Sequence, residues 1–225
     1  MKYRWLFFSL AALYFAAFCW RSSYVLNGTR YWLGADDVMI SADYGRTFAQ
    51  TGVMAWYPGY APTGTSSVVW SLAWAAAWLA WPDPAKTGLL MAALCCALWL
   101  LTLLFTFKAG AYQGGERAGL IAAALLAACW PYTNMAVGLW EWTAVGLGLS
   151  MAYYFWLRGR WKLALAGLAL AALVRLPLPP NTPAVLKLTG YPWSLMLTRG
   201  AWVEGVDLLT RGFPIFLLAL LGCWA

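Results

Sequence analysis

The chain has 225 residues, of which 63% are hydrophobic and only 10% are charged. A soluble domain of this length carries about 25% charged residues, so the composition excludes an ordinary soluble fold and indicates an integral membrane protein. The formal charge is +7. Most basic residues, however, lie beside apolar blocks, where they set topology or contact phospholipid headgroups, and we therefore expect no nucleic-acid partner.

The first apolar block covers residues 5–20 and follows Lys2 and Arg4. A charged start followed by a short apolar run also occurs in signal peptides. This run ends in Cys19-Trp20-Arg21, without the small residues of a cleavage site. We therefore expect a retained helix whose amino terminus faces the cytoplasm, because its positive charges lie there.

The later apolar blocks cover residues 66–81, 87–107, 118–130, 135–157, 163–174 and 213–225. A crossing helix needs about 20 apolar residues. If every block crossed, Arg158, Arg160 and Lys162 would lie outside, against the tendency of basic loops to remain in the cytoplasm. If block 66–81 instead lies in the interface or dips into it, these residues become cytoplasmic, together with Lys108 and Arg117.

The second arrangement fits the charges better and defines the predicted fold. We expect an all-α integral membrane bundle of about six spanning helices in the plasma or inner membrane, with short amphipathic or re-entrant helices in its first outer loop. Residues 1–225 form a single domain, with the first outer loop at 21–86 and a later outer loop at 175–212. Most of the acidic residues then lie on the outer, extracytoplasmic face.

Histidine is absent, and the five cysteines lie inside apolar blocks without CxxC spacing. Imidazole bases, histidine zinc ligands and a disulfide framework are therefore not expected. Chemistry would have to come from carboxylates and cations, and the adjacent Asp36 and Asp37 are the first candidates. They could cap the first turn of an amphipathic helix. Alternatively, one could take a proton from an acceptor hydroxyl while the other orients it or holds a divalent cation.

The segment 36–70 resembles, without a gap, the first outer loop of the GT-C superfamily of polyprenyl-phosphate-sugar-dependent glycosyltransferases. The likeness is strongest to actinobacterial terminal arabinofuranosyltransferases of the AftB type. The matching residues are Asp36, Asp37, Ile40, Ser41, Tyr44, Arg46, Ala49, Trp56, Pro58, Gly59, Gly64, Ser67 and Trp70. Further along, Gly138-Leu139-Trp140-Glu141 resembles the SGxET loop of the family. Pro180-Asn181-Thr182, followed by Lys187-Leu188-Thr189-Gly190-Tyr191-Pro192, resembles a later outer-loop pattern.

The resemblance implies a lipid-linked sugar donor, inversion at the anomeric carbon, and an acceptor hydroxyl on a glycan, a lipid or a protein. It makes Asp36 the base, with Asp37 as its partner and Glu141 as a further site carboxylate. The implied substrate-binding residues are Tyr44, Arg46, Trp56, Gly59, Arg175, Asn181 and Lys187. The cations among them, Arg46, Arg175 and Lys187, would receive the departing phosphate.

Simpler interpretations stay open for several of these residues. Glu141 could be a helix-start carboxylate, Lys187 a headgroup contact and Trp56 part of the aromatic belt at the interface. No cofactor is certain. Asp36 and Asp37 are the only residues put forward for a divalent metal ion, and their spacing does not decide whether one binds.

The chain also departs from the family. The glutamate of the family's VEGYT sequence is Thr63 here, and the arginine of its SFRY sequence is Asp43. Pro180 follows Arg175 almost at once, whereas helices separate the corresponding features in relatives, so the chain resembles a shortened version or a fragment. A non-catalytic relative that binds polyprenyl lipid or a partner transferase is therefore the alternative. A small transporter is disfavoured because the apolar blocks hold almost no charge and no inverted repeat is visible.

Overall fold

The computed structural model describes residues 2–32, 36–59 and 67–175, with the side chains of all of these except Lys2, Asp36 and Asp37. Its elements in chain order are α1 (Lys2–Ser22), β1 (Tyr24–Leu26), β2 (Thr29–Tyr31), α2 (Asp36–Thr51), α3 (Val68–Ala80), α4 (Pro84–Ala128), α5 (Trp130–Val137), α6 (Trp142–Leu157) and α7 (Trp161–Val174). Helices dominate the described residues, which confirms the predicted helical fold class.

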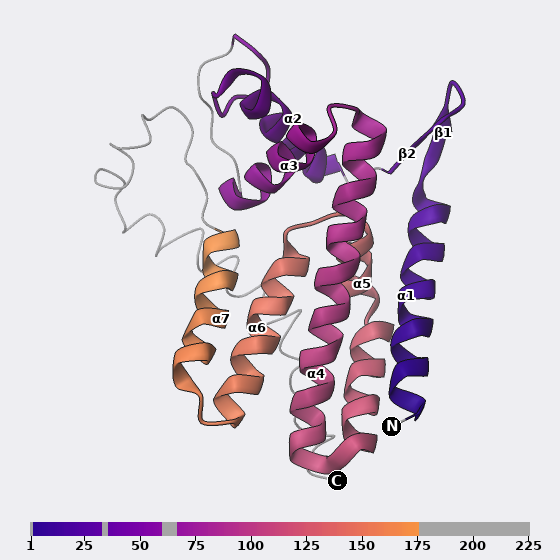
Figure 1. Ribbon diagram of the computed structural model, residues 1–225, viewed down its shortest axis with the longest axis vertical. Coiled ribbons are helices and arrows are strands. Elements are labelled where there is room, and N and C mark those ends of the chain that lie inside the picture. The colour runs from indigo at the N-terminus through magenta and orange to yellow at the C-terminus, as the bar shows by residue number, and fades with distance from the viewer. Residues whose placement is uncertain (1, 33–35, 60–66, 176–225) are drawn as a thin grey trace.

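The long helices stand side by side along the long axis of the molecule (Figure 1). α1 runs toward the end that carries α2 and α3, which we call the capped end. α4 starts at the capped end, runs to the opposite end, bends there and returns. After α5, α6 runs away from the capped end and α7 runs back to it (Figure 1). The opposite end holds the bend of α4 and the turn between α6 and α7, and we call it the basic end because of its side chains: Arg4, Lys108, Arg117, Arg158, Arg160 and Lys162.

The bend in α4 is built from glycine. Gly114 and Gly115 have non-helical backbone angles, and Gly115 has a φ of 81°, a region that favours glycine because it has no Cβ. On either side of the bend, the two halves of α4 approach closely, since a Cβ on Gly119 would lie 2.5 Å from the carbonyl oxygen of Phe107. Two predicted apolar blocks, 87–107 and 118–130, thus become the two arms of one bent element.

α6 and α7 pack closely through small residues. A Cβ on Gly148 would lie 2.6 Å from the carbonyl oxygen of Gly167, and a Cβ on Gly167 would lie 2.7 Å from the carbonyl oxygen of Gly148. Ala152 and Ala171 continue this line of contact one turn further along each helix. Small residues at four-residue spacing allow two backbones to approach, which is how helices associate when lipid removes the hydrophobic drive between them.

The capped end is formed by α2 and α3, which pack against each other. α2 buries one stripe, whose members Val38, Ser41 and Tyr44 lie three residues apart as expected for one face of a helix. Gly45 allows the contact with α3, because a Cβ there would lie 2.6 Å from both the carbonyl oxygen of Ser71 and the Cβ of Trp74. The amphipathic helix predicted after the Asp36-Asp37 pair is therefore present.

A short β-hairpin, which the sequence analysis did not expect, lies between α1 and α2. β1 pairs antiparallel with β2 around Asn27 and Gly28, whose φ values are 51° and 77°. An Asn-Gly pair with two positive φ values is the preferred two-residue connection of a hairpin. The aromatic rings of Tyr24 and Tyr31 stack across the strands with centroids 5.5 Å apart.

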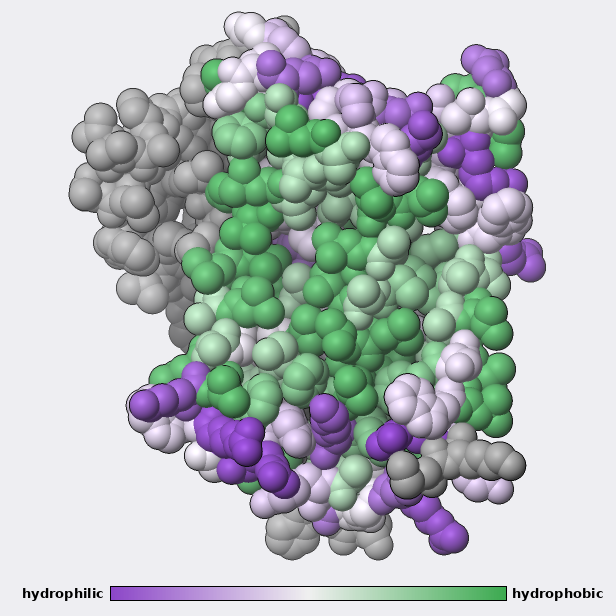
Figure 2. Space-filling model, in the orientation of Figure 1, coloured by the Kyte–Doolittle hydropathy of each residue, from purple (hydrophilic) through white to green (hydrophobic). Residues whose placement is uncertain are grey.

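Two of the described helices, α1 over Tyr3–Ser22 and α4 over Pro84–Ala128, are long and apolar enough to cross a membrane, by length and composition. α3 and α7 are apolar but have 13 and 14 residues, fewer than the roughly 20 that a perpendicular crossing needs. Figure 2 shows an apolar band across the middle of the molecule, between polar surfaces at the two ends. The predicted number of about six spanning helices therefore stays a prediction.

Candidate functional site

Three segments that carry predicted site residues meet near the capped end of the bundle. The first ends at the start of α3, the second is the turn between α5 and α6, and the third is the end of α7. Two side chains at the start of α3 join them. Ser67 donates a hydrogen bond to the backbone carbonyl of Val174, and the indole Nε1 of Trp70 donates one to the carbonyl oxygen of Leu139 at 2.9 Å.

Local sequence explains why these two side chains point inward. Ser67 is the N-cap of α3, and its hydroxyl accepts a hydrogen bond from the backbone N–H of Trp70 at 3.2 Å. A serine before an apolar run is a typical helix start, because it satisfies one of the unpaired N–H groups there. Both residues are nearly inaccessible, at 0% and 3% exposure. Their polar atoms therefore need partners inside the protein, and the carbonyls of Leu139 and Val174 supply them.

The turn between α5 and α6 has an unusual backbone conformation. Leu139 has a φ of 62° and is 1% exposed. A residue other than glycine in this left-handed region costs about 1–3 kcal/mol and persists only where its surroundings enforce it. Burial of the Leu139 side chain and the hydrogen bond from Trp70 to its carbonyl supply that enforcement. The turn places Glu141 at the N-cap position of α6, beside the end of α7.

Glu141 and Arg175 form the most enclosed ion pair of the described residues. Nη1 of Arg175 donates to Oε1 of Glu141 at 2.6 Å, and the two side chains are 23% and 4% exposed, respectively. The guanidinium carbon of Arg175 also lies 4.3 Å from the ring centroid of Trp142. A guanidinium that is stacked on an aromatic face and bound to a carboxylate has little freedom to move, so the pair fixes a cation close to the molecular surface.

The Asp36-Asp37 pair opens α2. Its side chains lie outside the described part of the structure, so its distances to Glu141 and Arg175 stay untested. The next residue, Val38, is 1% exposed and belongs to the same buried cluster as Trp70, Leu139 and Val174. The backbone that carries the aspartates is therefore anchored in the core that also carries the turn before Glu141.

The other predicted residues of the first outer loop are grouped around the second half of α2. Tyr44 is 3% exposed, and its ring packs edge-on against Trp56 with centroids 6.1 Å apart. The hydroxyl of Thr47 donates to the carbonyl oxygen of Trp56 at 3.2 Å. Trp56 itself is 37% exposed, and Gly59 has a φ of 86°. Tyr44 is thus a buried support in this arrangement, whereas Trp56 offers an exposed ring.

Arg46 is paired differently from Arg175. Its Nη2 lies 2.8 Å from Oδ1 of Asp43, one turn earlier on α2, and the side chains are 36% and 25% exposed, respectively. Burial raises the pKa of the Asp43 carboxyl above its ordinary value, and the nearby Arg46 guanidinium only partly opposes this shift. Asp43, where the sequence departs from the glycosyltransferase pattern, therefore supplies Arg46 with a counter-charge.

Two predicted binding residues, Asn181 and Lys187, lie outside the described residues, as does the later outer loop beyond Arg175. Among the side chains that the structure describes, no three His, Cys, Asp or Glu side chains gather as metal ligands. Asp36 and Asp37 are not among those side chains, so metal binding by the pair stays a prediction.

Sequence reasoning missed Trp142 and the linking role of Ser67 and Trp70. The serine before the apolar run of α3 could have been recognised as a helix N-cap, but no local signal identifies its partner over a hundred residues away. Comparison with protein-family models, with curated proteins and with solved structures finds no match for this chain.

Proposed function

We propose that this protein is a membrane glycosyltransferase that moves a sugar from a polyprenyl-phosphate donor to an acceptor hydroxyl on the extracytoplasmic face of the plasma or inner membrane. One observation carries the proposal. The segments that carry the residues implied by the glycosyltransferase resemblance lie far apart in sequence, yet Ser67 and Trp70 tie them together next to the Glu141–Arg175 pair. A chance likeness in sequence gives no reason for these segments to meet at one place.

The proposed orientation follows from the charges at the two ends. The basic end holds the cations named above and, among its described residues, Glu116 as the single carboxylate. Basic residues concentrate on the cytoplasmic side of membrane proteins. α1, the two arms of α4, α6 and α7 would cross, and block 213–225, outside the described residues, would supply a sixth crossing. The capped end, with Asp36, Asp37 and Glu141, would then face the outside.

The proposed reaction is a single displacement. The acceptor oxygen attacks the anomeric carbon of the donor sugar from the face opposite the phosphate, so the configuration inverts. The bond between that carbon and the phosphate oxygen breaks, and polyprenyl phosphate leaves with the electron pair. The proton of the acceptor hydroxyl passes to the carboxylate of Asp36, oriented by Asp37. Because phosphate is already a good leaving group, the protein needs one base and a cation to receive the new charge.

Arg175 is the cation best suited to receive the phosphate. Glu141 and Trp142 hold its guanidinium in place, so little side-chain freedom remains to be lost when a phosphate binds. Its side chain is 23% exposed. In this proposal Glu141 is a positioning residue that acts through Arg175. Arg46, whose side chain is 36% exposed at the surface of α2 and therefore less firmly held, has a secondary part.

The test is turnover by the purified chain. Protein in detergent is incubated with a polyprenyl-phosphoryl pentose or hexose and an acceptor, with Mg²⁺ or with EDTA, and release of polyprenyl phosphate is measured. Asp36→Asn should abolish release. Asp83→Asn is the matched control, because Asp83 caps α4 by accepting from the N–H of Lys86 at 3.0 Å, and asparagine caps helices equally well. Undiminished release by the Asp36→Asn protein would refute the assignment.

Two departures from the family pattern favour a second candidate function, a non-catalytic protein that binds polyprenyl lipid or a partner transferase. Thr63 stands where the family has a glutamate, and Asp43, where it has an arginine, pairs with Arg46. In that case the purified chain would retain polyprenyl phosphate but release none from the donor, and a larger membrane protein would co-purify with it. Turnover by the isolated chain would exclude this alternative.

A further inference from the structure

The basic end contains a cluster of cations and aromatic rings between α4 and α6. Nζ of Lys108, on α4, lies 5.3 Å from the ring centroid of Phe105 and 5.9 Å from that of Tyr154 on α6. The guanidinium carbon of Arg158, just beyond α6, lies 5.3 Å from the ring centroid of Tyr112 on α4. Each cation therefore contacts a ring of the neighbouring helix. We call these five residues the basic notch.

The cations of the notch keep their charge available. Lys108 and Arg158 are both exposed, and within residues 2–32, 36–59 and 67–175 neither forms an ion pair with a carboxylate. Aromatic faces attract a cation and hold it in place without neutralising it. Beside the notch, Nε2 of Gln113 donates to the hydroxyl of Tyr153 at 3.0 Å, which adds a polar contact across the same two helices.

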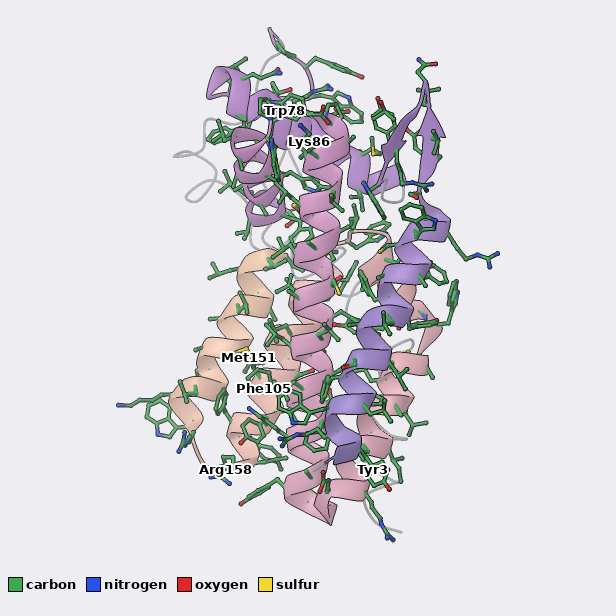
Figure 3. All side chains as sticks on the ribbon, turned by 45° about the vertical axis from the view of Figure 1, so that its right-hand side comes forward. Tyr3, Trp78, Lys86, Phe105, Met151 and Arg158 are labelled. Carbon is green, nitrogen blue, oxygen red and sulfur yellow. The ribbon has the colours of Figure 1, made fainter. Side chains whose placement is uncertain are left out.

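The apolar surface continues from the notch toward the middle of the bundle. Leu101, Phe105, Lys108 and Tyr112 are spaced by four, three and four residues, so they form one stripe along α4, and Leu101 is 41% exposed. Figure 3 shows Met151 of α6, Phe105 and Arg158 in order from the middle toward the basic end. A ligand with an anionic head and apolar tails would match this arrangement, in which a basic surface is followed by an apolar one.

We propose that the basic notch binds the headgroup of an anionic phospholipid, with the phosphate between Lys108 and Arg158 and the acyl chains along the stripe above. Basic pockets between membrane helices on the cytoplasmic side bind such headgroups. Figure 3 places Arg158 beyond Met151 and Phe105, at the basic end of the bundle, where the proposed orientation puts the phosphates of the cytoplasmic leaflet. The inference rests on the proposed membrane insertion and does not depend on glycosyl transfer.

The experiment measures lipid retention by the full chain. Protein stripped of lipid in a neutral detergent is titrated with phosphatidylglycerol or with phosphatidylcholine, and bound lipid is counted by native mass spectrometry. The combined substitutions Lys108→Gln and Arg158→Gln remove the two charges. Lys86→Gln and Arg21→Gln form the matched control, because they remove the same two kinds of charge from exposed positions at the other end of the bundle.

The unmodified protein and the control variant should each bind one phosphatidylglycerol molecule per chain, and they should bind it more tightly than phosphatidylcholine. The notch variant should lose about 30-fold in phosphatidylglycerol affinity, the combined effect expected of two cations at a membrane surface. Lys108→Arg should retain binding, and added salt should weaken it. Equal retention of the two lipids, or an equal loss in the notch and control variants, would overturn the proposal. Polyprenyl phosphate release is measured on the same samples. Failure of the lipid-binding proposal is thereby distinguished from failure of the proposed glycosyl transfer.

Discussion

The ion pair between Glu141 and Arg175 should contribute several times more to stability than the pair between Asp43 and Arg46. The chain offers this comparison directly, because both pairs join one acid to one arginine at similar N–O distances, 2.6 Å and 2.8 Å. They differ in burial. Glu141 and Arg175 are 4% and 23% exposed, whereas Asp43 and Arg46 are 25% and 36% exposed.

The expected magnitudes follow from that difference. Removing one partner of a buried pair costs about 3–5 kcal/mol, because the other charge is left without compensation. Arg175 keeps part of its contact with solvent, so we expect about 3 kcal/mol for Glu141→Ala and a coupling free energy of about 2 kcal/mol with Arg175→Ala. Ion pairs one turn apart on a helix surface have coupling free energies of about 0.3–0.5 kcal/mol. We expect a coupling free energy of this size between Asp43→Ala and Arg46→Ala.

The assay is a pair of double-mutant cycles. Each single and double variant is unfolded in mixed micelles with increasing dodecyl sulfate, and unfolding is followed by tryptophan fluorescence. Contacts that each side chain makes elsewhere cancel in the cycle, so only the interaction between the two partners remains. If the Glu141–Arg175 coupling were no larger than that of the exposed pair, the argument that this site holds a fixed cation would fail.

Three further predictions concern packing, the link from α3, and topology. Gly148→Leu should destabilise the bundle by about 3 kcal/mol or more in the same assay, because its side chain would meet the backbone of α7, whereas Leu149→Ala on the exposed face should cost under about 1 kcal/mol. Ser67→Ala should cost about 1–2 kcal/mol, since the N-cap bond and the bond to the end of α7 are lost together, and an unchanged unfolding midpoint would contradict this. In a cysteine-free background, Val25→Cys should react with an impermeant maleimide from outside the cell and Arg160→Cys only after permeabilisation; labelling of both from one side would disprove the orientation.

The helical bundle could be predicted because its signals are local. Apolar blocks identify the helices, and block 66–81 became the short α3, which packs with α2 at the capped end. The bend of α4 was marked by Gly114-Gly115 between two apolar blocks. The hairpin was missed although Asn27-Gly28 is a strong turn signal, because its two strands have only three residues each, too few to show the alternation typical of a strand.

The candidate site was predicted only in part, because its contacts link distant segments. Glu141 and Arg175 were each named from a short resemblance, yet nothing in the sequence indicated that they would pair with each other, since ion pairs over 34 positions have no local signature. For the pair between Asp43 and Arg46, in contrast, the sequence did contain a local signal. The charge of Asp43 was noted as a departure from the pattern, and the spacing of three residues to Arg46 was sufficient to predict a helical pair.

The direction of the hydrogen bonds at α3 explains why only half of the link was visible in the sequence. Ser67 and Trp70 donate from side chains, but both acceptors are backbone carbonyls, which every residue has. The link therefore requires particular residue types at the two donors, whereas the acceptors leave no mark in the sequence. The two hydrogen bonds also make the start of α3 and the Glu141–Arg175 ion pair one structural unit, because the carbonyls of Leu139 and Val174 lie within two residues of Glu141 and Arg175. A shift of α3 would move both ends of the pair, so changes in the capped end should reach the proposed phosphate site without contacting it.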